Sequence, residues 1–154
     1  MRNKDYYYYK VKLVEALEKV QKRATKLIPG CGKLSYEERL KRLKLPTLVY
    51  RRWRGDMITT FRMLNGLCDE GSGPDLAKNE YLATRGHREK LYRQQSGSNR
   101  RKYSFSQRVP EPWNSLPSSV IEAKTVNSFK SRLDVYMEEQ DLVYNYRKLL
   151  DKTR

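Results

Sequence analysis

Apolar residues recur at three- and four-residue spacing near the start of this chain, and this period restricts the segment to an α-helix. Between residues 10 and 28 the spacings are four, three, four and three, at Leu13, Leu17, Val20, Ala24 and Leu27. Residues spaced in this way lie on one face of a helix. Pro29-Gly30 then ends it, because proline has no backbone N–H and disfavours helical geometry in the preceding residue. We therefore expect an amphipathic helix over residues 10–28.

The next two helices are predicted from residues that cap helix ends. Ser35-Tyr36-Glu37-Glu38 has the pattern of a capping box, so a short helix should run from here to about Leu43. Thr47 is placed to cap a third helix, which Asn65-Gly66 should end. Its apolar stripe comprises Val49, Trp53, Met57, Phe61 and Leu64. We expect the Trp53 indole to lie in the core.

The second half of the chain is richer in loop signals. Residues 81–102 show no clear period and allow two short strands, at Tyr81-Leu82 and Leu91-Tyr92. Pro110 and Pro112 should end a helix near Arg108, and Trp113 should bury its indole in a turn. Thr125 is placed to cap a last helix, whose apolar residues are Val126, Phe129, Leu133 and either Tyr136 or Met137.

These elements predict a mainly α fold, a small helical bundle whose loop-rich middle segment has room for short strands and which ends in a C-terminal helix. We expect a basic three-helix segment over residues 1–66. Residues 67–80 combine glycine, serine and proline with acids, which is typical of a linker. A second lobe, with a basic loop region and the C-terminal helix, should occupy residues 81–154.

Positive charge is the strongest indication of function. The chain has 33 Lys and Arg residues against 18 Asp and Glu, a net charge of +15, which favours a polyanionic partner. Lysine and arginine bind a nucleic-acid backbone by displacing its counterions. We expect sequence-independent binding of RNA, DNA or an RNA/DNA duplex. The candidate contacts are Lys22, Arg23, Lys26, Arg51, Arg52 and Arg54 in the first segment and Arg85, Arg88, Lys90, Arg93, Arg100, Arg101 and Lys102 in the second.

Catalytic and metal-binding patterns do not occur in the sequence. Cys31 and Cys68 lack metal-ligand spacing, and His87 has no neighbouring ligand cluster, so we expect a surface histidine in a basic loop. No phosphate-binding glycine motif is present, and Asp56 and Glu70 are scattered acids. We expect no catalytic residues, metal, cofactor or small-molecule substrate. Without a signal core or an apolar span, we expect no membrane contact and an intracellular protein, in nucleus or cytoplasm.

Several motifs resemble the region that follows the catalytic domain in non-LTR retrotransposon reverse transcriptases of the LINE type (jockey and CR1-like). The resemblance covers roughly residues 14–137. It is carried by the run from Leu17 to Pro29, Leu34-Ser35-Tyr36-Glu37-Glu38-Arg39-Leu40, Leu45-Pro46-Thr47-Leu48, Tyr50-Arg51-Arg52, Arg54-Gly55-Asp56-Met57-Ile58, Leu64-Asn65-Gly66, Thr84-Arg85-Gly86-His87, Trp113-Asn114-Ser115-Leu116-Pro117 and Val126-Asn127-Ser128-Phe129-Lys130.

The resemblance implies thumb and C-terminal helices that hold template and primer beside an upstream polymerase core. The catalytic aspartates of that family lie upstream of the matching region, so the chain is expected to bind nucleic acid without being an enzyme. Two alternatives stay open. One is a helical protein-interaction module that docks on a polymerase core or on a second copy of itself. The other is a decayed element relic without a selected function.

Overall fold

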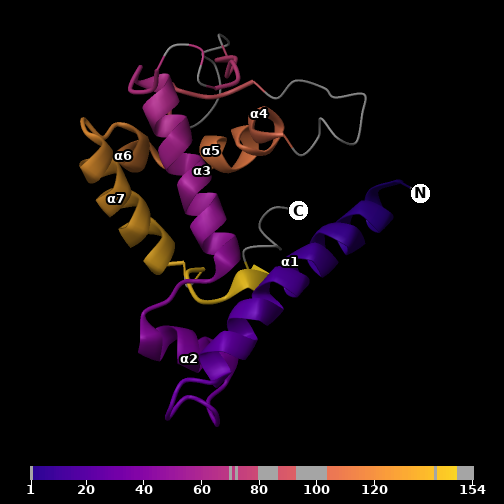
Figure 1. Cartoon of the computed structure of the whole chain (residues 1–154). Helices are drawn as coiled ribbons and strands as arrows, with labels where there is room; N and C mark the ends of the chain where they lie inside the picture. Colours follow the sequence, from indigo (N-terminus) through magenta and orange to yellow (C-terminus); the bar gives the residue numbers. More distant parts are fainter. Residues whose placement is uncertain are drawn as a thin grey trace. The chain divides into compact units, whose positions relative to one another are not determined.

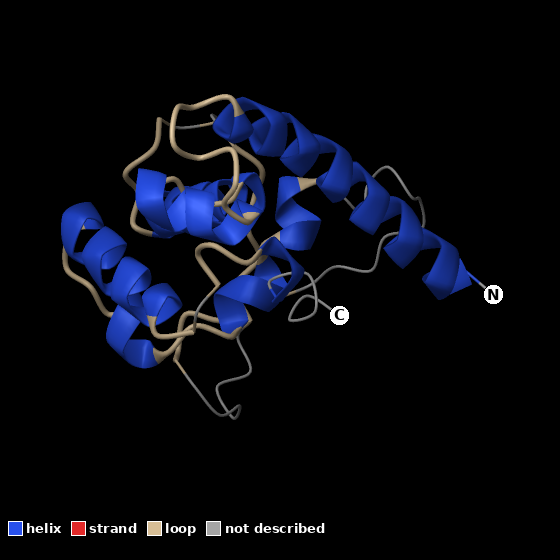
Figure 2. Ribbon diagram, turned by 90° about the horizontal axis from the view of Figure 1, so that it is seen from below, coloured by secondary structure: helices blue, strands red, loops and turns tan. Residues whose placement is uncertain are grey.

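The chain is mainly α-helical, as predicted. A computed structural model describes residues 2–69, 71, 73–79, 87–92, 104–140 and 142–148, with side chains from residue 11 onward. Its helices are α1 (Arg2–Lys26), α2 (Tyr36–Leu43), α3 (Leu48–Leu64), α4 (Phe105–Arg108), α5 (Pro110–Asn114), α6 (Ser118–Ile121) and α7 (Val126–Glu138) (Figure 1). Within these ranges the backbone forms no strand (Figure 2) and only one isolated antiparallel bridge, between Lys78 and Leu91.

All three predicted helix caps are confirmed. At the start of α2, the Ser35 hydroxyl accepts from the Glu38 N–H at 3.3 Å while the Ser35 N–H donates to the Glu38 carboxylate at 2.7 Å. Thr47 accepts from the Tyr50 N–H at 3.2 Å, and Thr125 accepts from the Ser128 N–H at 3.1 Å. Each side chain satisfies a backbone donor that the first helical turn leaves unpaired.

Other boundaries differ from the prediction. Helix α1 begins at Arg2 instead of near residue 10. A helix does end at Arg108, but Pro110 then starts α5, because proline at the first helical position loses no hydrogen bond. Leu91 contributes a single bridge instead of a strand, and Tyr81-Leu82 lies outside the described residues. Trp113 is buried as expected, within α5 instead of a turn.

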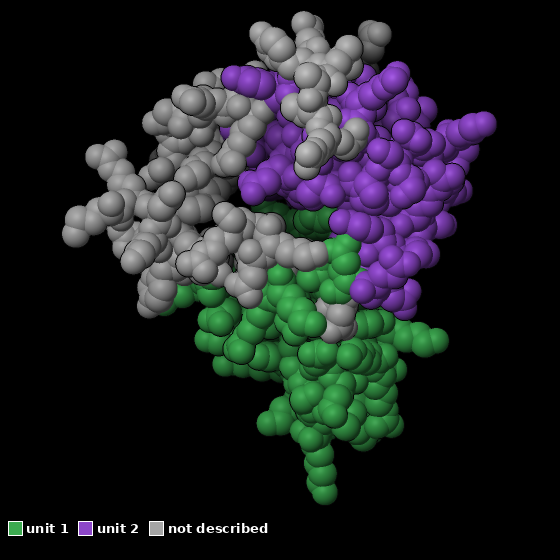
Figure 3. Space-filling view, turned by 180° about the vertical axis from the view of Figure 1, so that it is seen from behind, with its two compact units in different colours: residues 1–53, 140–154 green, residues 54–139 purple. Residues whose placement is uncertain are grey.

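The chain divides into two compact units (Figure 3). Unit 1 comprises residues 1–53 and 140–154, and unit 2 comprises residues 54–139. The division falls inside α3, and the described part of the predicted linker, residues 67–69, 71 and 73–79, belongs to unit 2. Residues 142–148 return to unit 1, where Leu142 is buried and the Thr47 N–H donates to the Val143 carbonyl at 3.1 Å.

Unit 1 is organised around a buried carboxylate on α1. Glu18 is fully buried; one oxygen accepts from the Tyr36 hydroxyl on α2 at 2.5 Å and the other from the Val49 N–H on α3 at 3.1 Å. Burial, followed by the hydrogen bond to Glu18, raises the pKa of Tyr36 well above its ordinary value. Tyr36 therefore stays a neutral donor, and Glu18 ties α1 to both following helices.

A buried arginine makes a second polar link in unit 1. The Arg39 guanidinium donates to the Thr25 hydroxyl at 3.2 Å, to the Lys22 carbonyl at 3.4 Å and to the Leu34 carbonyl. It thereby links α2 to the last turns of α1 and to the segment that connects the two helices. Arg39 is 7% exposed, so its charge serves the packing of α2 on α1.

The predicted apolar stripe of α1 is exposed, which corrects the expectation of an amphipathic helix packed by its apolar face. Leu13, Leu17, Val20 and Leu27 are 67%, 52%, 66% and 85% exposed. Helix α1 packs by its polar face instead. On that face Glu18 accepts from Tyr36 of α2 and from the Val49 N–H of α3, and Thr25 accepts from Arg39 of α2.

Unit 2 encloses an aromatic core. Phe61 of α3 stacks on Phe129 of α7 at a centroid distance of 4.3 Å, and Trp113 lies 6.0 Å from Phe129. The Trp113 indole N–H donates to the Glu89 carbonyl at 2.7 Å, so the buried indole leaves no unpaired donor. Trp53, the second residue of the predicted stripe, belongs to unit 1 and does not lie in a core: it is only partly buried, and its ring centroid lies 6.2 Å from that of Tyr50.

His87 is buried against Trp113, in contrast to the predicted surface position. Its Nε2 lies 3.2 Å from the Trp113 carbonyl, which can only accept, so Nε2 carries the proton. Nδ1 is buried and has no hydrogen-bond partner among the described residues. Burial lowers the pKa of His87 most; nearby Lys90 lowers it further, whereas the bond to Trp113 and the charges of Glu89 and Glu122 raise it.

Stability should therefore rise with pH through the histidine range. The folded state holds His87 neutral at pH values where the unfolded chain, with a pKa near 6.5, still binds a proton. Unfolding free energy should increase from the lowered pKa up to about pH 7, by at most about 1.4 kcal/mol per pH unit for one proton. Denaturant unfolding at several pH values measures this slope. His87→Gln should remove it, and an unchanged slope would contradict the buried neutral state.

Candidate nucleic-acid interface

Helix α1 presents an exposed basic face. Lys19, Arg23 and Lys26 are all exposed, and their spacing of four and three residues places them on one side of the helix, over about 10 Å. Glu18 faces into unit 1 and is hydrogen bonded there, so its charge does not offset them at the surface. None of the three forms an ion pair with a described residue. We call these residues the α1 basic face.

The sequence predicted two members of this face and missed the third. Arg23 and Lys26 were predicted contacts, whereas Lys19 was not. Its position four residues before Arg23 places it on the same face of the helix and could have identified it. Lys22 was also predicted but is oriented differently. It is partly buried, with its ammonium 5.2 Å from the Tyr36 ring centroid and 5.9 Å from that of Tyr146. A cation over aromatic rings stabilises unit 1 itself.

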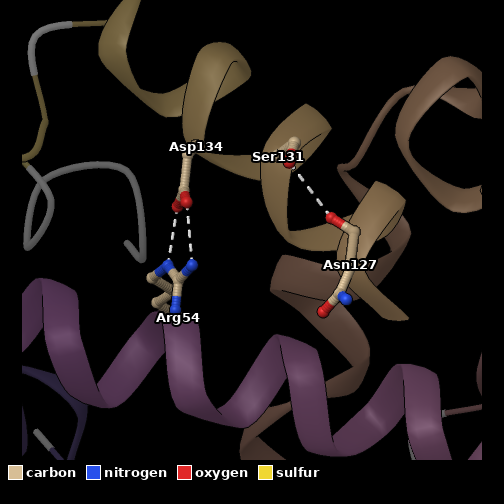
Figure 4. A network of polar contacts seen from close by, with 4 residues as sticks. All are labelled: Arg54, Asn127, Ser131 and Asp134. Carbon is tan, nitrogen blue, oxygen red and sulfur yellow. Dashed lines mark hydrogen bonds and ion pairs between the residues drawn. The ribbon is translucent and has the colours of Figure 1, made fainter. Parts of the chain in front are cut away.

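The three predicted arginines of α3 separate into two groups. Arg51 and Arg52, in unit 1, are exposed, and neither pairs with an acidic group among the described residues. Arg54, in unit 2, forms a bidentate pair with Asp134 of α7, at 2.6 and 2.7 Å (Figure 4). Bidentate pairs fix both side chains in one geometry. Arg54 therefore holds α3 to α7, and its fork is already occupied by a carboxylate.

Asp56 forms a second bidentate pair, with Arg108. Its carboxylate accepts from Arg108 of α4 at 2.9 and 2.8 Å, and this hydrogen bond raises the pKa of Arg108 above its ordinary value. Asp56 is only 17% exposed. It serves as the anchor of α4 on α3 within unit 2.

The structure describes two residues of the second basic cluster. Arg88 is exposed, whereas Lys90 is partly buried and its carbonyl accepts from the Asn79 N–H at 2.8 Å. The other predicted contacts, Arg85, Arg93, Arg100, Arg101 and Lys102, lie outside the described residues. The cluster beyond Arg88 and Lys90 stays a prediction.

The described residues contain no group of three histidine, cysteine or acidic side chains placed to hold a metal ion. Cys31 is a buried free thiol, and Cys68 is a partly buried one. Across the same part of the chain, every helix is too short or too polar to cross a membrane.

Comparison with protein-family models, curated protein sequences and solved structures finds no significant match to this chain. The resemblance to retrotransposon reverse transcriptases therefore rests on the sequence motifs alone.

Proposed function

We propose that this chain is a non-catalytic nucleic-acid-binding segment of the kind found after the catalytic domain of non-LTR reverse transcriptases. The observation that supports this proposal is that the basic residues of the described part of the chain fall into two groups, one bonded within the protein and one exposed. Arg39, Arg54 and Arg108 are held by internal oxygen atoms. Lys19, Arg23, Lys26, Arg51 and Arg52 are exposed in unit 1 and lack acidic partners in the described part of the chain. A polyanion is the ligand that suits such side chains.

The ligand we propose is the backbone of RNA or of an RNA/DNA duplex. Exposed lysines and arginines contact phosphates without reading bases, so binding should be largely independent of sequence. The choice of RNA follows from the family resemblance, as does an upstream polymerase core as a further partner.

Binding should weaken steeply as salt is raised. Each neutralised phosphate contributes about −0.9 to the slope of log affinity against log salt on B-form DNA and about −0.7 on single strands. Replacing Lys19, Arg23 and Lys26 with glutamine keeps helix propensity and should reduce the slope by up to about three units. Replacing Arg51 and Arg52 should reduce it by up to about two units. Fluorescence anisotropy with an RNA/DNA duplex between about 50 and 200 mM salt measures both.

Arg54→Gln is the matched control, because it removes an arginine from the same helix, and the charge of this arginine is already paired with Asp134. It should leave the salt slope unchanged while circular dichroism reports any loss of stability. A wild-type slope near zero would overturn the proposal. If the salt slope falls in Arg54→Gln but not in the Arg51 and Arg52 variant, the contact has been assigned to the wrong arginines.

A further inference from the structure

Helix α1 has an apolar face that nothing in the described structure covers. The face is formed by Leu13, Leu17, Val20 and Ala24 of α1 and by Leu27, the first residue after α1, and we call these five residues the α1 seam. All five are exposed, four of them by half or more of their surface. Soluble proteins seldom leave a contiguous apolar stripe in water, and such a stripe marks an interaction surface. The proposed binding of nucleic acid does not use it, because aliphatic side chains offer nothing to a phosphate.

The spacing of the seam fits a second helix of the same kind. Alternating steps of four and three residues follow a 3.5-residue period, which is the pattern of knobs-into-holes packing between helices. In heptad terms Leu17 and Ala24 occupy a positions, and Leu13, Val20 and Leu27 occupy d positions. A self-complementary stripe of this type can pair about a two-fold axis, with the same residues contributed by each copy.

The charges beside the seam also permit self-pairing, although the chain carries +15. The flanking positions that would meet across a helix pair hold Val14, Ala16, Gln21 and Arg23, of which only Arg23 is charged. Lys19 and Lys26 lie at c positions, turned away from the seam. Two copies could therefore meet along the seam without facing rows of like charge.

We propose that the α1 seam is a homodimer interface, in which two copies of the chain pair through α1. The seam spans about 21 Å of a helix about 10 Å wide, so the pair buries less than the roughly 1,200 Å² of a standard interface. The dimer is consequently weak and concentration-dependent. Salt strengthens it by screening the repulsion between two basic chains, which is the opposite of its effect on nucleic-acid binding.

Sedimentation equilibrium of the whole chain tests the proposal at about 5 to 500 μM, the range of weak interfaces. The average mass should rise from that of one 18.4 kDa chain toward twice that value, and the rise should be larger at higher salt. Leu17→Gln with Val20→Gln should raise the dissociation constant about 100-fold or more, because each loss occurs in both copies. Val135→Gln, which removes an apolar side chain 57% exposed on α7, is the matched control and should leave the constant unchanged.

The seam variant should keep the wild-type melting temperature in dilute solution, because its residues are exposed in the single chain. If it unfolds, Leu27→Gln, which changes only the most exposed seam residue, replaces it in the same measurement. A single-chain mass at every concentration, or a dimer that the seam variants do not weaken, overturns the proposal. The nucleic-acid salt slope of the seam variant separates the two ideas, since it should equal that of the wild type.

Discussion

Replacing Trp113 with alanine is expected to lower the free energy of unfolding of unit 2 by about 3–5 kcal/mol, as large aromatic truncations in cores do. The indole is 1% exposed, lies 6.0 Å from Phe129 and contacts His87 edge-on at 6.1 Å. Its removal leaves a cavity between α5 and α7 and frees the Glu89 carbonyl from its hydrogen bond. Denaturant unfolding followed by circular dichroism measures the loss.

Trp53→Ala is the matched control for this experiment. Trp53 belongs to unit 1, is partly exposed and stacks on Tyr50, so its removal should cost less than half as much. Each variant also leaves one indole to report on its surroundings. Trp113 alone should emit at short wavelength, and Trp53 alone at longer wavelength. If Trp53→Ala lowers the free energy of unfolding more than Trp113→Ala does, the core does not surround Trp113.

The sequence predicted the elements of this fold better than their packing. Ser35, Thr47 and Thr125 identified three helix starts because capping is local: the side chain bonds a backbone group three residues away. Phe129 and Leu133 were predicted from hydrophobic periodicity and are buried on α7, and of the two alternatives Tyr136 and Met137 it is Met137 that is buried. The α6 turn carries no capping side chain, and it was missed.

The candidate interface was only partly predictable, for an electrostatic reason. Counting charges identifies basic segments, but it cannot tell a free guanidinium from one held by a carboxylate distant in sequence. Arg54 and Asp134 are 80 residues apart, and Arg108 and Asp56 are 52 apart. No local pattern connects them. Arg51 and Arg52 have the same sequence context as Arg54, yet the structure leaves them exposed.

Helix α1 shows the limit of hydrophobic periodicity most directly. Its period correctly predicted a helix, but the predicted direction of burial was wrong: Glu18 faces α2 and α3, and the apolar stripe is exposed. Glu18 is the residue of the buried face that contacts both following helices, because its carboxylate accepts from Tyr36 of α2 and from the Val49 N–H of α3. Periodicity alone places Glu18 on the solvent face, and there the substitution Glu18→Leu would leave the free energy of unfolding unchanged.

Glu18→Leu should instead destabilise unit 1 by about 2–6 kcal/mol, because it leaves two donors without an acceptor and each buried unpaired group costs about 1–3 kcal/mol. These donors are the Tyr36 hydroxyl and the Val49 N–H. Glu18→Gln, which keeps one acceptor oxygen, should lose less. Denaturant unfolding of Glu18→Leu, Tyr36→Phe and the double variant forms a cycle that isolates the contact between the two side chains. Tyr36→Phe should be costly in the wild type but nearly neutral beside Glu18→Leu, because the unpaired hydroxyl is then removed. If Glu18→Leu is as stable as the wild type, the buried carboxylate does not hold α1 on α2 and α3.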